Sequence, residues 1–294
     1  MESQNLQKKS RKLLVGFPMM LISLIIVLTA VPLIMVYSGN IGNLMQSAGI
    51  KMHPNIDDGF LISDFEDPSG DLLRKLPPGD IYQGAENALD ILKFSVKKVK
   101  FRPLSGVGIA PRLNLTYEFR GKLPNPLNSS HEFSLPVIHT YIDAPDKTPK
   151  QITSNKIADV LFAEKDWDYQ IIIDGFHEQA RIYDTEGTLI GTGLGIYINY
   201  SYENVIRDSN KTENIVKSTK ITAGLPMKLL GDPSKGKWAF YVISGLADMN
   251  DYTMMLPAVN ETEPQIFDVV LPEETPVIEF DARPKIYPLK INNL

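Results

Sequence analysis

Four acidic residues lie within eight positions of one another in the stretch SDFEDPSGD, at residues 63–71. Its proline and glycine are typical of a tight turn, which would bring the carboxylates on either side together. Calcium takes about six to eight hard oxygen ligands, including carboxylates and backbone carbonyls, from bent segments of this kind. The stretch therefore predicts a structural calcium site, with a plain Asx turn as the alternative. The candidate ligands are Asp64, Asp67, Gly70 and Asp71.

Aromatic residues in predicted strands offer a second kind of chemistry, because the apolar face of a sugar ring can stack on an aromatic ring. The chain has two tryptophans, Trp167 and Trp238, and Tyr141 lies in the strand-like run VIHTYID. We take these three as candidate ligand-binding residues. Both tryptophans lie in strongly apolar contexts, so packing in the core is the alternative for them.

Motifs of catalytic chemistry do not occur in the sequence. The histidines, His53, His131, His139 and His177, are scattered and form no H-E-x-x-H pair. There is no G-x-S-x-G and no phosphate-binding loop. The G-x-G-x-G run at residues 191–195 lies within a strand pattern with no helix after it, which indicates close sheet packing or a bulge. We predict that the chain is not an enzyme.

A long apolar stretch, residues 13–37, carries no charged residue. As a helix rising about 1.5 Å per residue it would reach roughly 37 Å, enough to cross a bilayer with some tilt. Four basic residues precede it and no charge follows until Lys51, so the positive-inside rule places the N-terminus in the cytoplasm and the remainder outside. A cleaved signal peptide and a buried helix are the alternatives. We predict a single-pass protein of the cell membrane with an extracellular C-terminal part.

The composition limits the partners of that outer part. The chain has 294 residues, with 30 basic residues against 35 acidic ones and no cysteine. Four of the basic residues and one acidic residue lie in the first 50, so the remainder, 26 against 34, carries a net charge of −8. An acidic surface disfavours nucleic acid and anionic lipid as partners. Without disulfides, the outer part must be stabilised by its core and by any metal that it binds.

Alternating apolar and polar residues predict strands throughout the outer part. The clearest case is RLNLTYEFR, residues 112–120, in which apolar and polar side chains face opposite ways. Residues 60–66, 90–103 and 137–143 also have the pattern of strands, and KWAFYVIS, residues 237–244, is apolar on both faces, as in a central strand. Short strands separated by turn signals favour an all-β, two-sheet antiparallel β-sandwich with one N-terminal transmembrane helix.

The predicted organisation has five parts, and the outer part of about 244 residues is long enough to bury a core. The C-terminal part is rich in proline, which favours extended edge segments. The five parts are a cytoplasmic basic tail (1–12), a transmembrane helix (13–37), a juxtamembrane stalk (38–59), an extracellular β-sandwich (60–272) and a proline-rich extended C-terminal segment (273–294).

N-glycosylation is indicated by repeated N-x-[ST] acceptor patterns on the predicted outer side and none in the tail. The two that fall in predicted strands lie on the polar face, where a sugar would not disturb the core. Chance matches to so short a motif are the alternative. The acceptors are Asn114, Asn128, Asn199, Asn210 and Asn260.

Several longer motifs follow one another over about residues 60–272: DFEDPSGD, GAENALDILKFSV, LPVIHTYID, WDYQIIIDG, ITAGLPMKLLGDPSKGKWAFYVI and PQIFDVVLP. Their order resembles the C-terminal module of glucodextranases. Relatives of that module are appended to amylolytic enzymes and occur in archaeal surface proteins, and the family is similar to other carbohydrate-binding β-sandwiches. The resemblance implies a non-catalytic, surface-associated module, often with calcium.

The family's acidic turn maps onto Asp67, Gly70 and Asp71 of this chain. A further acidic residue is usual after the last of these, and Leu72 takes its place here. The stretch rich in glycine and tyrosine that normally follows is replaced by LLRKLPPGDIY. The chain therefore departs from the family at the turn that the calcium prediction depends on.

Three functions from different classes follow. The first is a membrane-anchored extracellular glycoprotein whose β-sandwich binds carbohydrate, in particular cell-envelope glycans. The second is an accessory or structural subunit of a larger membrane or surface-layer complex, in which the sandwich is a docking scaffold for other envelope proteins. The third is a haem-binding sandwich with His139 or His177 and a methionine as ligands, which no spacing in the sequence selects.

Overall fold

The computed structural model describes residues 59–68, 70–74, 76–79, 82, 85, 89–101, 110–145, 160–164, 167–208, 211–257, 265–272 and 284–291. Antiparallel sheets make up most of these ranges, and their one α-helix is the four-residue α3 (Met227–Leu230). The prediction of an all-β, antiparallel fold is confirmed. The predicted transmembrane helix, at residues 13–37, lies outside the described residues, as do the tail and the stalk up to residue 58. In the ranges above, no helix is both long and apolar enough to cross a bilayer.

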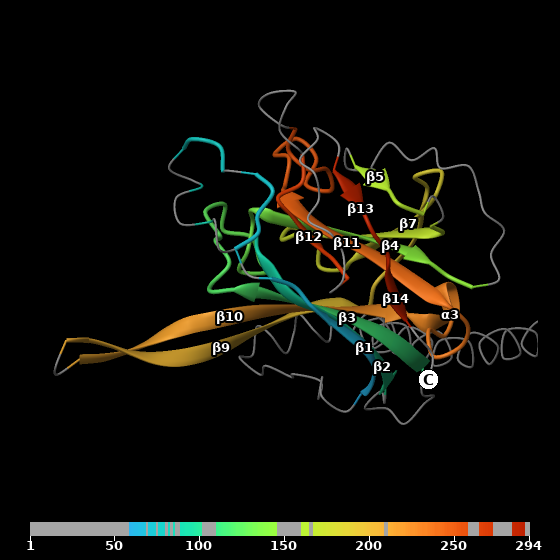
Figure 1. Ribbon diagram of the computed structural model, residues 1–294, viewed down its shortest axis with the longest axis horizontal. Helices are drawn as coiled ribbons and strands as arrows, with labels where there is room; N and C mark the ends of the chain where they lie inside the picture. Colours follow the sequence, from blue (N-terminus) through green and yellow to red (C-terminus); the bar gives the residue numbers. More distant parts are fainter. Residues whose placement is uncertain are drawn as a thin grey trace, which may run out of the picture. The chain divides into compact units, whose positions relative to one another are not determined.

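The first sheet has five strands in the order β1-β2-β3-β10-β9, and every neighbouring pair is antiparallel (Figure 1). Alternation sets its two faces, since Leu113, Leu115, Tyr117 and Phe119 on β3 are all fully buried on the face toward the core. The strands are β1 (Phe60–Glu66), β2 (Ile91–Phe101), β3 (Ala110–Arg120), β9 (Gly195–Asp208) and β10 (Lys211–Pro226).

The second sheet has seven strands, six of them in the order β12-β11-β4-β6-β7-β8, with β14 pairing with β11. Its central strands are apolar on both faces, as in YQIII of β6 and WAFYVISGL of β11, because both faces are covered. The strands are β4 (Pro136–Asp143), β6 (Tyr169–Ile173), β7 (Arg181–Asp184), β8 (Leu189–Thr192), β11 (Trp238–Leu246), β12 (Asp268–Val270) and β14 (Leu289–Ile291).

The C-terminal segment contributes to the second sheet. Its last strand, β14, continues the sheet along β11, where Ile291 pairs with Trp238 and Leu289 pairs with Phe240. A separate small sheet joins β13 (Lys285–Ile286) in parallel to β5 (Leu161–Phe162). The chain from residue 284 to 291 therefore packs as part of the sandwich, with Leu289 and Ile291 in its main core.

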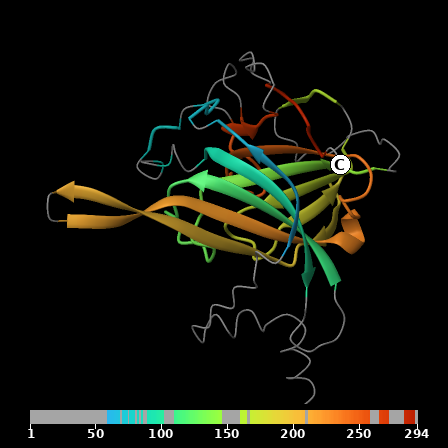
Figure 2. The same cartoon turned by 60° about the horizontal axis from the view of Figure 1, so that its bottom comes forward.

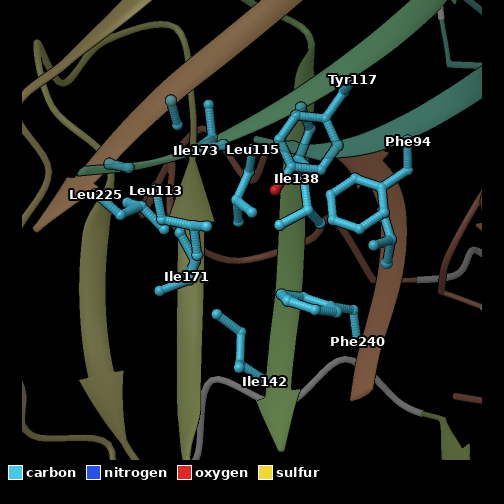
Figure 3. Close-up of a cluster of buried hydrophobic side chains, with 14 of the residues drawn as sticks. Phe94, Leu113, Leu115, Tyr117, Ile138, Ile142, Ile171, Ile173, Leu225 and Phe240 are labelled. Atoms are coloured by element: carbon cyan, nitrogen blue, oxygen red, sulfur yellow. The ribbon is translucent and has the colours of Figure 1, made fainter. Parts of the chain in front are cut away.

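The main core lies between the two sheets (Figure 3). Phe94 of β2 contacts the rings of Tyr117 on β3 and Phe240 on β11, with centroids 5.3 and 5.7 Å apart. The hydroxyl of Tyr117 forms a buried hydrogen bond of 2.7 Å with Thr140 of β4, so its polar atom is satisfied across the sandwich. Fully burying one such aromatic side chain contributes about 1.5–3 kcal/mol.

A second apolar cluster covers the other face of the second sheet. It contains Tyr141 and Trp167, whose ring centroids lie 5.2 Å apart, and Phe162 packs against both. Trp238 belongs to the main core and donates its indole N–H to the carbonyl of Lys235 at 2.9 Å. Trp167 and Trp238 are each 2% exposed and Tyr141 is 0% exposed. This corrects the prediction that these three residues bind ligand, because no sugar can reach their rings.

β9 and β10 continue beyond the rest of their sheet as a twisted two-stranded ribbon (Figures 1 and 2). β10 pairs with β3 only from Ser218 to Pro226, whereas its pairing with β9 begins at Lys211. We call the part beyond β3, residues 201–208 and 211–217, the arm. Most of its described side chains are exposed or half-buried, as expected for a ribbon with solvent on both faces.

Candidate metal centre

The chain leaves β1 in a tight turn that carries the predicted acidic residues. Asp67 comes directly after β1, and its backbone N–H donates to the carbonyl of Leu92 on β2 at 3.0 Å. Gly70 has a φ of +86°, a left-handed conformation that glycine adopts without strain. Its N–H donates to Oδ2 of Asp90 at 3.0 Å. Hydrogen bonds to the side chain of Asp90 and to the backbone of Leu92 therefore fix the turn.

Two aspartates distant in the sequence lie at the same place. Asp90 immediately precedes β2, and Asp268 is the first residue of β12. Oδ2 of Asp268 accepts the N–H of Ile91 at 2.6 Å, and Oδ1 of Asp67 accepts the N–H of Leu271 at 3.1 Å. These bonds join β12 of the second sheet to the β1–β2 edge of the first. The cluster therefore stands where the two sheets meet.

Carboxylate oxygens of Asp67, Asp71 and Asp268 lie within 4.8 Å of one another. Asp67 and Asp268 are 8% and 1% exposed, and Asp71 faces solvent. Among the described residues, Oδ2 of Asp67 and Oδ1 of Asp90 are buried without a hydrogen-bond partner. Buried carboxylate oxygens without a partner are costly and call for a cation or a proton.

The electrostatics of the cluster favour protonation when no cation is present. Burial, with the nearby charges of Asp71 and Asp90, raises the pKa of Asp67 to about 8. Burial likewise raises the pKa of Asp268 well above its usual range, with further contributions from Asp67, Asp71 and Asp90. The pKa values of Asp71 and Asp90 are raised by burial as well. The charges of Asp71 and Asp90 thus oppose the ionisation of the two more buried carboxyl groups, Asp67 and Asp268.

The donor set fits calcium. Every candidate ligand is a hard oxygen, with no histidine or cysteine of the kind that zinc prefers. Backbone N–H groups orient Asp67 and Asp268, so the protein already fixes these two carboxylates. Asp71 opens the cluster to solvent, which leaves room for water to complete a coordination shell. A divalent cation here would neutralise the mutual repulsion and would tie β12 to the turn after β1.

The structure brings some of the predicted metal ligands together and separates another from them. Asp67 and Asp71 come together, and the peptide of Gly70 shapes the turn between them. Asp64 lies elsewhere, because three residues of extended strand separate it from Asp67 by roughly 10 Å. Its carboxylate instead lies 2.8 Å from Nζ of Lys93, which also pairs with Glu66. This corrects the inclusion of Asp64 among the ligands.

Sequence reasoning missed Asp90 and Asp268, which lie about 20 and 200 residues from the turn. A signal for both was present, since Asp90 directly precedes a strand that begins ILKF and Asp268 is followed by the apolar run VVL. A charged residue next to a buried strand needs a partner, and here the partners are main-chain N–H groups and, for Asp90, the side chain of Arg120.

The predicted glycosylation sites differ in how far they are buried. Asn128 is exposed in a turn and Asn199 is half-buried on the edge strand β9, so both remain predictions that the fold allows. Asn114 is fully buried in β3, between β2 and β10, and this corrects the expectation that it could carry a glycan. Asn210 and Asn260 lie outside the described residues.

The predicted haem ligands have other partners in the structure. His139 is buried and its Nε2 lies 2.9 Å from the carbonyl oxygen of Thr253. His177 contacts Asp174 through Nδ1 at 2.9 Å. Each imidazole is thus oriented by protein groups, and nothing in their placement selects a haem.

The sandwich that carries this cluster matches a known family. Residues 62–276 match the family described as the C-terminal binding module, SLH-like, of glucodextranase. No curated protein sequence matches the chain. The family match begins in β1, contains Asp67, Asp71, Asp90 and Asp268, and extends past β12, so it covers well over half of the chain. The chain therefore belongs to the family of SLH-like C-terminal binding modules of glucodextranase.

Proposed function

We propose that this protein is a membrane-anchored extracellular glycoprotein whose β-sandwich binds glycans of the cell envelope without catalysis. The observation that carries the proposal is the family match over residues 62–276, which is a match to a binding module and not to a catalytic domain. The uncharged stretch at residues 13–37 and the basic residues before it support the membrane anchor. The acceptors Asn128 and Asn199, which the fold leaves accessible, support glycosylation.

Calcium has a structural part in this proposal. The aspartate cluster joins the turn after β1 to β12, and so it links the two sheets at one edge of the sandwich. A cation held by Asp67, Asp71 and Asp268 would stabilise the folded module by neutralising carboxylates that otherwise repel one another. Because the bonds of the cluster join β12 to the turn after β1, its expected effect is on the stability of the sandwich.

The glycan proposal is tested with the full-length protein in a detergent that has no sugar head group. The protein is mixed with insoluble neutral polysaccharides, namely α- and β-linked glucans and mannan, and the bound fraction is measured after sedimentation. We expect retention on at least one polysaccharide and release by its soluble oligosaccharide. Absence of retention on all of them, with the protein still folded, would contradict the glycan-binding proposal.

A docking scaffold in a larger membrane complex is the second candidate. The observation that favours it is the arm, a polar two-stranded ribbon that extends beyond the sandwich and has an open edge on β9 among the described strands. Arms of this kind can add to a neighbouring protein. Purification from native membranes in mild detergent distinguishes the two, since stoichiometric co-eluting polypeptides would favour the scaffold and elution alone would favour glycan binding.

A further inference from the structure

The loop of residues 121–135, which joins β3 to β4, has an unusual backbone. Asn128 and Glu132 have φ values of +52° and +63°, and they are the non-glycine residues with positive φ among the described ranges. Glutamate is disfavoured in this left-handed region, so its surroundings must hold it there. Residues held in such conformations gather at ligand-binding and catalytic sites.

Hydrogen bonds within the loop hold this conformation. The side chain of Asn125 accepts the N–H of Ser129 at 2.9 Å and donates to the carbonyl of Ser129 at 3.1 Å. Oγ of Ser134 accepts the N–H of Leu127 at 3.1 Å, and the N–H of Ser134 donates to the carbonyl of Pro124 at 3.0 Å. The loop is thus built before any ligand arrives, which lowers the entropic cost of binding.

The loop is also fixed from outside. Gly175, after β6, lies so close to the carbonyl oxygen of Phe133 that an added Cβ would be 1.7 Å from it. The N–H of Gly121 donates to the carbonyl of Lys217 at 2.8 Å, and the hydroxyl of Thr219 donates to the carbonyl of Gly121 at 2.6 Å. These two hydrogen bonds of Gly121 attach the loop to the base of the arm.

A cavity of about 450 Å³ opens at this loop, and it is lined by Lys122, Leu123, Pro124, Asn125 and Glu132. Its volume is within the range of small-ligand sites, about 300–1,000 Å³. The amide of Asn125 is engaged within the loop, as described above. Lys122 and Glu132 therefore supply a cationic donor and a carboxylate acceptor at the cavity, with apolar surface between them from Leu123 and Pro124.

Two tyrosines at the base of the arm stand beside the cavity. The hydroxyl of Tyr200 donates to Oε2 of Glu132 at 2.8 Å, which connects β9 to the lining of the cavity. The ring of Tyr202 lies next to that of Tyr200, with centroids 6.4 Å apart. Tyr202 is 57% exposed, which is high for so large a side chain, so a ligand can reach it from solvent.

We propose that the cavity and these two tyrosines form a saccharide subsite for neutral hexopyranose oligosaccharides. The apolar face of one sugar ring would stack on Tyr202, and hydroxyls of the next ring would donate to Glu132 and accept from Lys122. The inference rests on the proposed glycan-binding function and gives it a location. It differs from the predicted site at Trp167, Trp238 and Tyr141, whose rings are buried.

The chemistry of the subsite selects a neutral sugar. Hydroxyl groups both donate and accept, so they can satisfy a carboxylate and an ammonium group at the same cavity. An anionic ligand would meet Glu132, and a cationic ligand would meet Lys122. Bonds to these charged groups also exceed neutral hydrogen bonds in strength, which offsets part of the cost of desolvating the sugar.

The test compares variants of the full-length protein in binding to hexasaccharides of α-1,4-, α-1,6- and β-1,4-linked glucose and of mannose. The protein is prepared without N-glycans, so that no sugar at Asn128 covers the loop. Tyr202→Ala and Glu132→Gln should each weaken binding about tenfold, while Tyr202→Phe should bind like the parent. Phe60→Ala is the matched control, because Phe60 is an exposed aromatic residue on β1, at the opposite edge of the same sheet.

The outcomes separate the two proposals. If the parent protein binds none of the hexasaccharides, the glycan-binding function and its subsite both fail. If the parent binds and Tyr202→Ala and Glu132→Gln bind equally well, the function stands and this location is wrong. Thermal unfolding of each variant shows whether a loss of binding reflects a loss of folding. Gly175→Ala supplies independent evidence, because displacing Phe133 should weaken binding while leaving Tyr202 and Glu132 in the chain.

Discussion

Two buried acidic sites in this molecule have opposite surroundings. At the first, Asp174, in the turn after β6, is 1% exposed and is surrounded by donors. Its Oδ1 accepts the N–H groups of Phe176 at 2.8 Å and His177 at 3.0 Å, and Nδ1 of His177 lies 2.9 Å away. Nη2 of Arg181 lies 3.6 Å from Oδ2. The protein satisfies this carboxylate with its own groups.

At the second site, several carboxylates share too few donors. Asp67 accepts one backbone N–H, and Asp268 accepts two. Asp90 accepts the N–H of Gly70 and lies 3.5 Å from Nε of Arg120. Two buried oxygens have no partner there among the described residues. The difference shows that burial of a carboxylate does not by itself indicate a metal site. A metal site is indicated when buried acceptor oxygens outnumber the donors around them, and the Asp174 site has no such surplus.

The largest effect that this comparison predicts is at the satisfied site. Asp174→Ala should lower the free energy of unfolding by about 3 kcal/mol, because it leaves the partly buried N–H groups of Phe176 and His177, and Arg181, without their shared acceptor. Chemical denaturation with and without calcium measures the loss. Asp248→Ala is the control, since Asp248 accepts the N–H of Asn250 in an exposed turn and should cost under about 1 kcal/mol.

Calcium itself distinguishes the sites in that experiment. The stabilisation by calcium should be the same in Asp174→Ala as in the parent, because Asp174 takes no part in the cluster. A calcium effect that disappears in Asp174→Ala would show that the two sites act as one, and the comparison would be invalid.

The next effect is the response to calcium. At a concentration of about 100 times its dissociation constant, a bound ion stabilises the fold by about 2.7 kcal/mol, which raises the Tm of a domain of this size by about 5–10 °C. Asp268→Asn should abolish the rise while keeping an acceptor for the N–H of Ile91. Asp64→Asn, which lies outside the cluster, should keep the rise in Tm on adding calcium. If chelation leaves the Tm of the parent unchanged, the cluster does not bind calcium.

Much of the fold was predictable because strand signals are local. The run at residues 60–66 coincides with β1, and the alternation at residues 112–120 lies within β3. The strand patterns in the sequence do not predict the arm, whose two strands run beyond the rest of the first sheet. Both faces of a projecting ribbon meet solvent, so its sequence has no apolar face and no alternation to detect.

The candidate site was predictable only in its local part. Asp67 and Asp71 share one turn, and turn chemistry brings them together. Asp268 joins them through sheet packing between distant segments, which no local pattern encodes. The aromatic prediction failed for a related reason, because the sequence shows that Trp167 and Trp238 are aromatic but not which side of each strand meets solvent.

The third predicted effect is the pH dependence of the metal-free protein. The pKa of Asp67 is raised to about 8 by burial and neighbouring charge, against about 3.9 in an unfolded chain. Between these values the folded state retains a proton that the unfolded state has released. Stability is therefore highest below about pH 4 and falls as the pH rises toward 8.

Calcium should remove or reverse this slope, because it binds the ionised carboxylates and its affinity rises with pH. The measurement is Tm at about pH 5, 6, 7 and 8, in chelator and in calcium, for the parent and for Asp67→Asn. In chelator, Tm of the parent should fall across this range, and Asp67→Asn should flatten the fall because its amide does not titrate. A Tm that is constant or rises with pH in chelator would mean that the protein accommodates the ionised aspartates unaided, as it does Asp174, and the distinction between the two buried sites would no longer hold.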